Sequence, residues 1–125
     1  MIELNLKQGY LAMFYLLDEY YWKPTQDDSL AMILSSLSPF IFIDCMSADP
    51  ACWQEWQETA KKITNKDFMT VDDVLKTSIA FLKLYSNDFY KIEWLIVELE
   101  KLSPESDILK IYVNKAIKEK DSRVI

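Results

Sequence analysis

The side chains that could perform chemistry in this chain are its two cysteines and its neighbouring carboxylates. Cys52 lies near the start of a predicted helix, where the positive end of the helix dipole lowers the pKa of a thiol. The chain contains no histidine, so a cysteine nucleophile lacks its usual base and a zinc site lacks its nitrogen ligands. We interpret Cys45 and Cys52 as small, partly buried apolar residues. Whether the two thiols interact is left open.

Adjacent carboxylates occur repeatedly along the chain. Hydrolysis of a glycosidic bond needs two carboxyl groups that face each other across a substrate, one of them with a raised pKa. Neighbouring residues on a helix point about 100° apart, so they do not face each other. We therefore interpret the pairs as solvated helix starts and faces. They are Asp18 with Glu19, Asp27 with Asp28, and Asp72 with Asp73.

The composition excludes several classes of function. Gly9 is the single glycine, whereas phosphate-binding loops and dinucleotide fingerprints need several. With one glycine and no histidine, we expect no metal, no cofactor and no enzymatic activity. The first residues lack the apolar run of a secretory signal, and no apolar stretch reaches the roughly 18 residues of a membrane span. A cytoplasmic location without membrane contact is expected.

The charge balance is acidic. The chain carries 14 Lys and Arg against 20 Asp and Glu, which gives a formal net charge of −6. Direct binding to nucleic acid is not expected, because that work needs cationic side chains to neutralise phosphates. An acidic surface instead suits a basic partner. Simple solubility of a small domain explains the same charge, and both interpretations remain open.

The apolar spacing predicts an all-α protein. Half of the 125 residues are hydrophobic, which is enough for one domain with a real core. Apolar residues recur at steps of three and four, which is the period of a buried helix face. We predict a single-domain bundle of about six helices over residues 1–125, with a frayed end at 118–125 and a buried connection, without strands, at 39–49. The helices are expected at about 6–23, 25–38, 50–64, 70–86, 87–102 and 104–117.

Local signals mark the helix starts. A short polar side chain before a helix accepts hydrogen bonds from its free N–H groups, and proline favours the first helical position. A capping box adds a carboxylate three residues later that bonds back to the cap. The predicted starts are Thr25 or Asp27, Asp49 with Pro50, Thr70 with Asp73, and Ser103 with Pro104.

The stretch "SADPACWQEW" places two tryptophans three residues apart on the predicted helix 50–64. The apolar residues of this helix form a narrow stripe, so we expect a surface helix that contacts the core along one edge. Trp53 and Trp56 lie on that stripe and could serve the core or an interface. Trp22, just before Pro24, could cover the end of the bundle or contact a partner, and Trp94 lies off the centre of its helix's apolar face.

Three segments occur in a fixed order over residues 9 to 60: "GYLAMFYLLDEYYW", "DDSLAMILSSL" and "ADPACWQEW". This order resembles the immunity proteins of bacterial contact-dependent growth inhibition and related polymorphic toxin systems. The resemblance implies an inhibitor that binds and neutralises the C-terminal toxin domain of such a system, often a nuclease, inside the producing cell. The alternative is a helical adaptor or structural interaction module without a toxin partner.

The predicted partner-binding surface follows from the placement of charge. Residues 24–60 contain no lysine or arginine, whereas the rest of the chain mixes its charges. We expect a basic partner to contact the carboxylates of this stretch, with an exposed Trp53 or Trp56 as the apolar anchor. The predicted partner-binding residues are Asp27, Asp28, Asp44, Asp49, Trp53, Glu55, Trp56 and Glu58.

Overall fold

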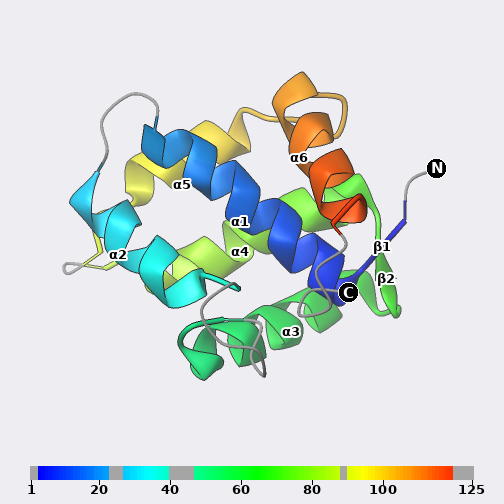
Figure 1. Cartoon of the computed structure of the whole chain (residues 1–125), viewed down its shortest axis with the longest axis horizontal. Helices are drawn as coiled ribbons and strands as arrows, with labels where there is room; N and C mark the ends of the chain where they lie inside the picture. Colours follow the sequence, from blue (N-terminus) through cyan, green and yellow to red (C-terminus); the bar gives the residue numbers. More distant parts are fainter. Residues whose placement is uncertain (1–2, 23–26, 40–46, 88–89, 120–125) are drawn as a thin grey trace.

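The computed structural model describes residues 3–22, 27–39, 47–87 and 90–119 (Figure 1). Within these residues the chain forms six helices and one two-stranded sheet, which confirms the prediction of an all-α bundle. The elements in chain order are β1 (Leu4–Asn5), α1 (Leu6–Trp22), α2 (Asp28–Leu37), α3 (Pro50–Thr64), β2 (Phe68–Met69), α4 (Val71–Tyr85), α5 (Glu93–Glu100) and α6 (Asp107–Ile117).

Helix α1 is the central element of the bundle. It crosses the middle of the molecule, with α6 packed against one side and α2, α3 and α4 against others (Figure 1). A helix that is packed from several sides needs apolar residues around most of its circumference. The run from Gly9 to Leu17 meets this requirement, since all of its residues except Phe14 are buried.

An aromatic junction joins α1, α3 and α4. The Trp56 side chain is fully buried and makes edge-to-face contacts with Tyr10, at 5.8 Å between ring centroids, and with Phe81, at 6.0 Å. The indole Nε1 of Trp56 donates a hydrogen bond to the carbonyl oxygen of Leu6 at 3.3 Å. Such pairs stabilise a core beyond the area that they bury. We refer to Tyr10, Trp56 and Phe81 as the aromatic junction.

Gly9 allows α1 to approach strand β2 closely. A Cβ atom at this position would lie 2.6 Å from the Met69 Sδ and 3.5 Å from the Trp56 Cζ2. The first distance is shorter than van der Waals contact, so any larger residue would displace the buried Met69 side chain. The single glycine of the chain therefore serves helix packing.

The sheet was not predicted from the sequence. Strands β1 and β2 pair antiparallel, with Leu4 opposite Met69 and Asn5 opposite Phe68. Two-residue strands are too short to show the alternating pattern by which strands are recognised. The pairing brings the buried Leu4 and Met69 side chains to the edge of the core. The predicted connection at 39–49 lies mostly outside the described residues.

The capped helix starts of α2, α3 and α4 agree with the sequence. The Asp27 carboxylate accepts a hydrogen bond from the Leu30 N–H at 3.0 Å, so Asp27 is a cap of α2, and Thr25 lies outside the described residues. The Asp49 carboxylate accepts from the Ala51 N–H at 3.1 Å, with Pro50 at the first helical position.

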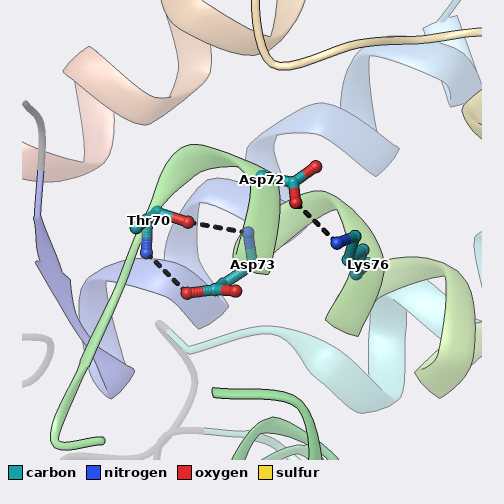
Figure 2. Close-up of polar contacts among 4 residues, drawn as sticks. All are labelled: Thr70, Asp72, Asp73 and Lys76. Carbon is teal, nitrogen blue, oxygen red and sulfur yellow. Dashed lines mark hydrogen bonds and ion pairs between the residues drawn. The ribbon is translucent and has the colours of Figure 1, made fainter.

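Helix α4 starts with a complete capping box (Figure 2). The Thr70 hydroxyl accepts from the Asp73 N–H at 3.1 Å, and the Asp73 carboxylate accepts from the Thr70 N–H at 3.0 Å. The neighbouring Asp72 pairs with Lys76, one turn further, at 2.8 Å. Two otherwise free backbone N–H groups are thereby satisfied, which fixes the start of α4 at Val71.

Helices α5 and α6 begin later than predicted. The expected start of α6 at Ser103 and Pro104 is wrong, because α6 begins at Asp107 with Ser106 in the capping position. The Ser103 N–H donates to the Ser106 Oγ at 2.9 Å, and the Ser106 N–H donates to the Ser103 carbonyl at 3.0 Å. These bonds form a turn in place of the first helical turn.

Two tyrosines fasten α6 to α1. The Tyr112 hydroxyl donates to the Glu19 Oε2 at 2.7 Å, and the Tyr15 hydroxyl donates to the Glu119 Oε2 at 2.8 Å. The Lys115 ammonium lies 4.1 Å from the centroid of the Tyr15 ring, which is a cation–π contact. Of the end predicted to fray, 118–125, residues 120–125 lie outside the described residues, whereas Glu119 takes part in this interface.

Candidate functional site

The net charge of the chain comes from one stretch. Residues 24–60 hold six carboxylates and no lysine or arginine, whereas the other 88 residues hold 14 acidic and 14 basic side chains. The whole charge of −6 is therefore concentrated on the stretch that contains α2 and α3. A charge that is confined in this way produces a directional field, whereas scattered charge does not. We refer to the described part of this stretch, residues 27–39 and 47–60, as the acidic helix pair.

The acidic helix pair is a continuous structural unit. The Asp49 N–H at the start of α3 donates to the carbonyl oxygen of Ser36, near the end of α2, at 2.9 Å. The Ser47 hydroxyl accepts a hydrogen bond from the Trp53 N–H at 3.0 Å and donates to the Asp49 carbonyl. These bonds hold the start of α3 against the end of α2. The carboxylates of both helices are thus carried by a fixed frame.

The predicted carboxylates are accessible to different degrees. Asp28, Asp49 and Glu58 are exposed, and Asp27 and Glu55 are half-buried. Asp44 lies outside the described residues. The ion pairs between described residues lie elsewhere, on α4, on α5 and between these two helices. Within the described part of the chain, no lysine or arginine therefore neutralises these carboxylates, although Asp27 and Asp49 cap helices and Glu58 accepts a hydrogen bond from the Gln54 side chain.

The structure separates the two tryptophans of α3. Trp53 is half-buried and packs edge-to-face on Tyr10, at 5.4 Å between centroids, so part of its ring borders the surface. Trp56 belongs to the aromatic junction and is fully buried. The expectation that Trp56 could be an exposed anchor is therefore wrong. The buried positions of α3 follow a four-residue step, and Trp53 lies beside this row; they are Cys52, Trp56, Ala60 and Thr64.

Trp22 is the exposed tryptophan of the described residues. Its side chain is 60% exposed, at the last position of α1, and its ring packs edge-to-face on Tyr21 at 5.2 Å. Trp94, in contrast, is half-buried and packs against the core. The sequence had left the role of Trp22 open. Its signal in the sequence was its place at the end of an apolar helix, two residues before Pro24.

The Cys52 thiol is a buried group of the core. Its Sγ accepts a hydrogen bond from the Tyr85 hydroxyl at 3.4 Å, beside a cavity of about 40 Å³ that Ile33, Ser36 and Tyr90 help to line. Burial raises the pKa of the Cys52 thiol, although the bond from Tyr85 acts in the opposite direction. The thiol is held in its less nucleophilic, protonated form. Cys45 lies outside the described residues.

Burial also raises the pKa of two tyrosines next to this thiol. For Tyr10, burial is the main cause and the proximity of Cys52 adds to it. For Tyr85, burial is again the main cause, and the hydrogen bond to Cys52 adds to it. A phenol with a raised pKa stays protonated and serves as a hydrogen-bond donor. The arrangement supports packing between α1, α3 and α4.

The described residues form no cluster that could hold a metal ion, since no three Cys, Asp or Glu side chains among them lie close enough together. None of the helices in the described ranges combines the length and the apolar character that a membrane crossing needs. Open pockets of about 370 and 400 Å³ lie beside the start of α5, and Glu93 lines both of them.

The fold and sequence define a small all-α protein whose net negative charge comes from the stretch that contains α2 and α3. Comparisons of the chain with family models, with curated proteins and with solved structures found no match. A functional conclusion therefore depends on the chain's own residues and on the resemblance in its sequence segments.

Proposed function

We propose that this protein is an immunity protein that binds and neutralises the toxin domain of a contact-dependent growth inhibition system. The toxin domain is a basic protein, of the kind that cleaves nucleic acid. The resemblance of residues 9–60 to such immunity proteins supports the proposal. The observation that carries it is the concentration of the whole net charge on residues 24–60.

Electrostatics gives the acidic helix pair a physical role in such a complex. A nuclease carries a basic cleft that attracts phosphates, and an acidic surface can occupy the same cleft. Charges that border an interface accelerate association, and this acceleration weakens as salt screens them. Asp28 and Glu58 are suited to this role, because both are exposed and neither pairs with a lysine or arginine of the described residues.

The test is protection of cells and binding in solution. The chain is co-produced with the C-terminal toxin domain of the secreted protein encoded beside its gene, and growth is measured. The purified pair is then studied by association kinetics at low and at physiological salt. We expect growth to be restored by the chain, a stable complex, and an association rate that falls steeply with salt.

A pair of charge reversals tests the role of the acidic helix pair. The variant Asp28→Lys with Glu58→Lys should slow association at least about tenfold and flatten its salt dependence. The control, Asp67→Lys with Glu105→Lys, changes the net charge equally at two exposed positions outside the acidic helix pair. We expect the control to have a smaller effect, because its charges lie away from the proposed contact.

Two results would contradict the immunity function, and a third would contradict the role of the acidic helix pair. Absence of a toxin domain encoded beside the gene would favour an adaptor without a toxin partner. Failure of the wild-type chain to bind or protect against that domain would remove the immunity function directly. Equal effects of the two double variants would show that only the overall charge matters.

A further inference from the structure

The largest exposed apolar side chain among the described residues is Trp22. Burial in water-free packing is the usual state of a tryptophan, and the ring of Trp22 is instead 60% exposed. Tryptophan is also the residue type most enriched among the side chains that contribute most to protein association. Its ring packs edge-to-face on Tyr21 at the last position of α1, and most of its surface remains exposed.

Trp22 lies between two carboxylates in the sequence. Asp18 lies one helical turn earlier on α1, and Asp28 begins α2, whose start lies at the same end of the molecule as the last turn of α1 (Figure 1). Met32, one turn after Asp28, is 46% exposed and adds apolar area on the same side of α2. Trp22 thus places an exposed apolar side chain at the end of the molecule where α2 begins; Lys23, between them in sequence, lies outside the described residues.

The other strongly exposed apolar side chains are of different residue types. Leu84 on α4 and Ile111 on α6 are each 60% exposed, as Trp22 is, and Val97 on α5 is 50% exposed. A lysine is the sequence neighbour of Leu84, of Ile111 and of Trp22 alike, so adjacent charge does not separate these three sites. Tryptophan is enriched among the side chains that contribute most to protein association, whereas leucine and valine are under-represented. Residue type therefore distinguishes Trp22 from these alternatives.

We propose that Trp22 is the apolar anchor of the interface, inserted into an apolar pocket of the toxin domain that lysine and arginine side chains border. The proposal rests on the immunity function proposed above. In this arrangement the pocket covers the exposed indole ring, while Asp18 and Asp28 face the surrounding positive groups. The anchor that the sequence assigned to α3 is thereby located at the end of α1.

The experiment compares two truncations with equal starting exposure. Trp22→Ala and the matched control Leu84→Ala are each measured for dissociation rate and affinity against the purified toxin domain that the wild-type chain binds. Trp22→Ala should accelerate dissociation and weaken affinity about 30-fold or more, with little change in association rate. Leu84→Ala should change affinity less than about threefold. Circular dichroism and the denaturation midpoint verify that both variants are folded.

A second measurement uses fluorescence. Acrylamide should quench the wild-type chain less in the complex than in the free state, and this difference should largely disappear in Trp22→Phe. Wild-type affinity in Trp22→Ala, or equal losses in the two truncations, would overturn the anchor while leaving the immunity function intact. If the wild-type chain forms no complex with the toxin domain, the immunity function itself fails and the anchor fails with it.

Discussion

The aromatic junction and the end of α1 both present a tryptophan, yet the surroundings of the two side chains are opposite. Trp56 is enclosed by Tyr10, Phe81 and the backbone of Leu6, and no part of it reaches solvent. Trp22 touches Tyr21 and is mostly exposed. Residue type alone therefore does not assign a tryptophan to the core or to the surface. The decisive factor is whether neighbouring helices surround its position.

Truncation of each tryptophan should give the largest difference in stability between the two sites. Trp56→Ala should lower the free energy of unfolding by about 3–5 kcal/mol, because it leaves a large cavity in the core. Trp22→Ala should lower it by less than about 0.5 kcal/mol, since the ring is already in water. Urea denaturation monitored by circular dichroism measures both. Similar losses in the two variants would show that the two sites do not differ as described.

The close approach at Gly9 provides the next largest effect. Gly9→Ala gains about 1 kcal/mol of helix propensity, but overpacking against the buried Met69 costs about 1–3 kcal/mol. We expect a net destabilisation of about 1 kcal/mol in urea denaturation. In the double variant Gly9→Ala with Met69→Ala, the loss in free energy of unfolding should be smaller than the sum of the two single losses by about 0.5 kcal/mol or more. Strict additivity would indicate that Met69 does not limit the approach of α1.

The starts of α4 and α6 differ in how their cap residues contribute to stability. Thr70→Ala removes one half of the capping box of α4, the helix that supplies Phe81, and should cost about 1 kcal/mol. Ser106→Ala should cost a few tenths of a kcal/mol, roughly, because the Ser106 side chain makes no cap bond in α6. Thermal unfolding compares the two variants, and a larger loss for Ser106→Ala would contradict the assignment.

The smallest expected effect is a dependence on alkaline pH. Burial, together with the hydrogen bond to Glu19, raises the pKa of Tyr112 to about 12. Because the pKa of an unfolded tyrosine is about 10, this contribution to stability is complete below pH of about 10 and is lost as the pH rises through about 12. Tyr112→Phe should flatten this loss. Denaturation midpoints across the alkaline range measure it, and an unchanged slope would argue against the Tyr112–Glu19 bond.

Much of the fold was predictable because its signals are local. Asp49 with Pro50, and Thr70 with Asp73, combine a cap with a second feature, and the structure places helix starts at both. Ser103 with Pro104 resembles such a start, but Ser106 offers a competing partner for the Ser103 backbone. A local pattern cannot show which of two nearby serines the backbone will use. The sheet was missed because two residues carry no periodicity.

The candidate site was less predictable, since exposure depends on packing between distant segments. The carboxylates of residues 24–60 could be recognised by counting charges, which needs no structure. The separation of Trp53 from Trp56 could not, because both lie near the apolar stripe of α3 and only contact with α1 and α4 determines which is enclosed. The exposure of Trp22 likewise depends on where the other helices end.

The tyrosine bonds between α6 and α1 have a consequence for synthesis of the chain. Tyr112 bonds to Glu19 across 93 residues, and Tyr15 bonds to Glu119 across 104 residues. Helix α1 leaves the ribosome before α6, so one side of the central helix stays uncovered until α6 has been made. Contacts of such long range also slow folding relative to local helical pairs. Until α6 has emerged, the nascent chain therefore exposes an apolar side of α1 that is buried in the folded protein.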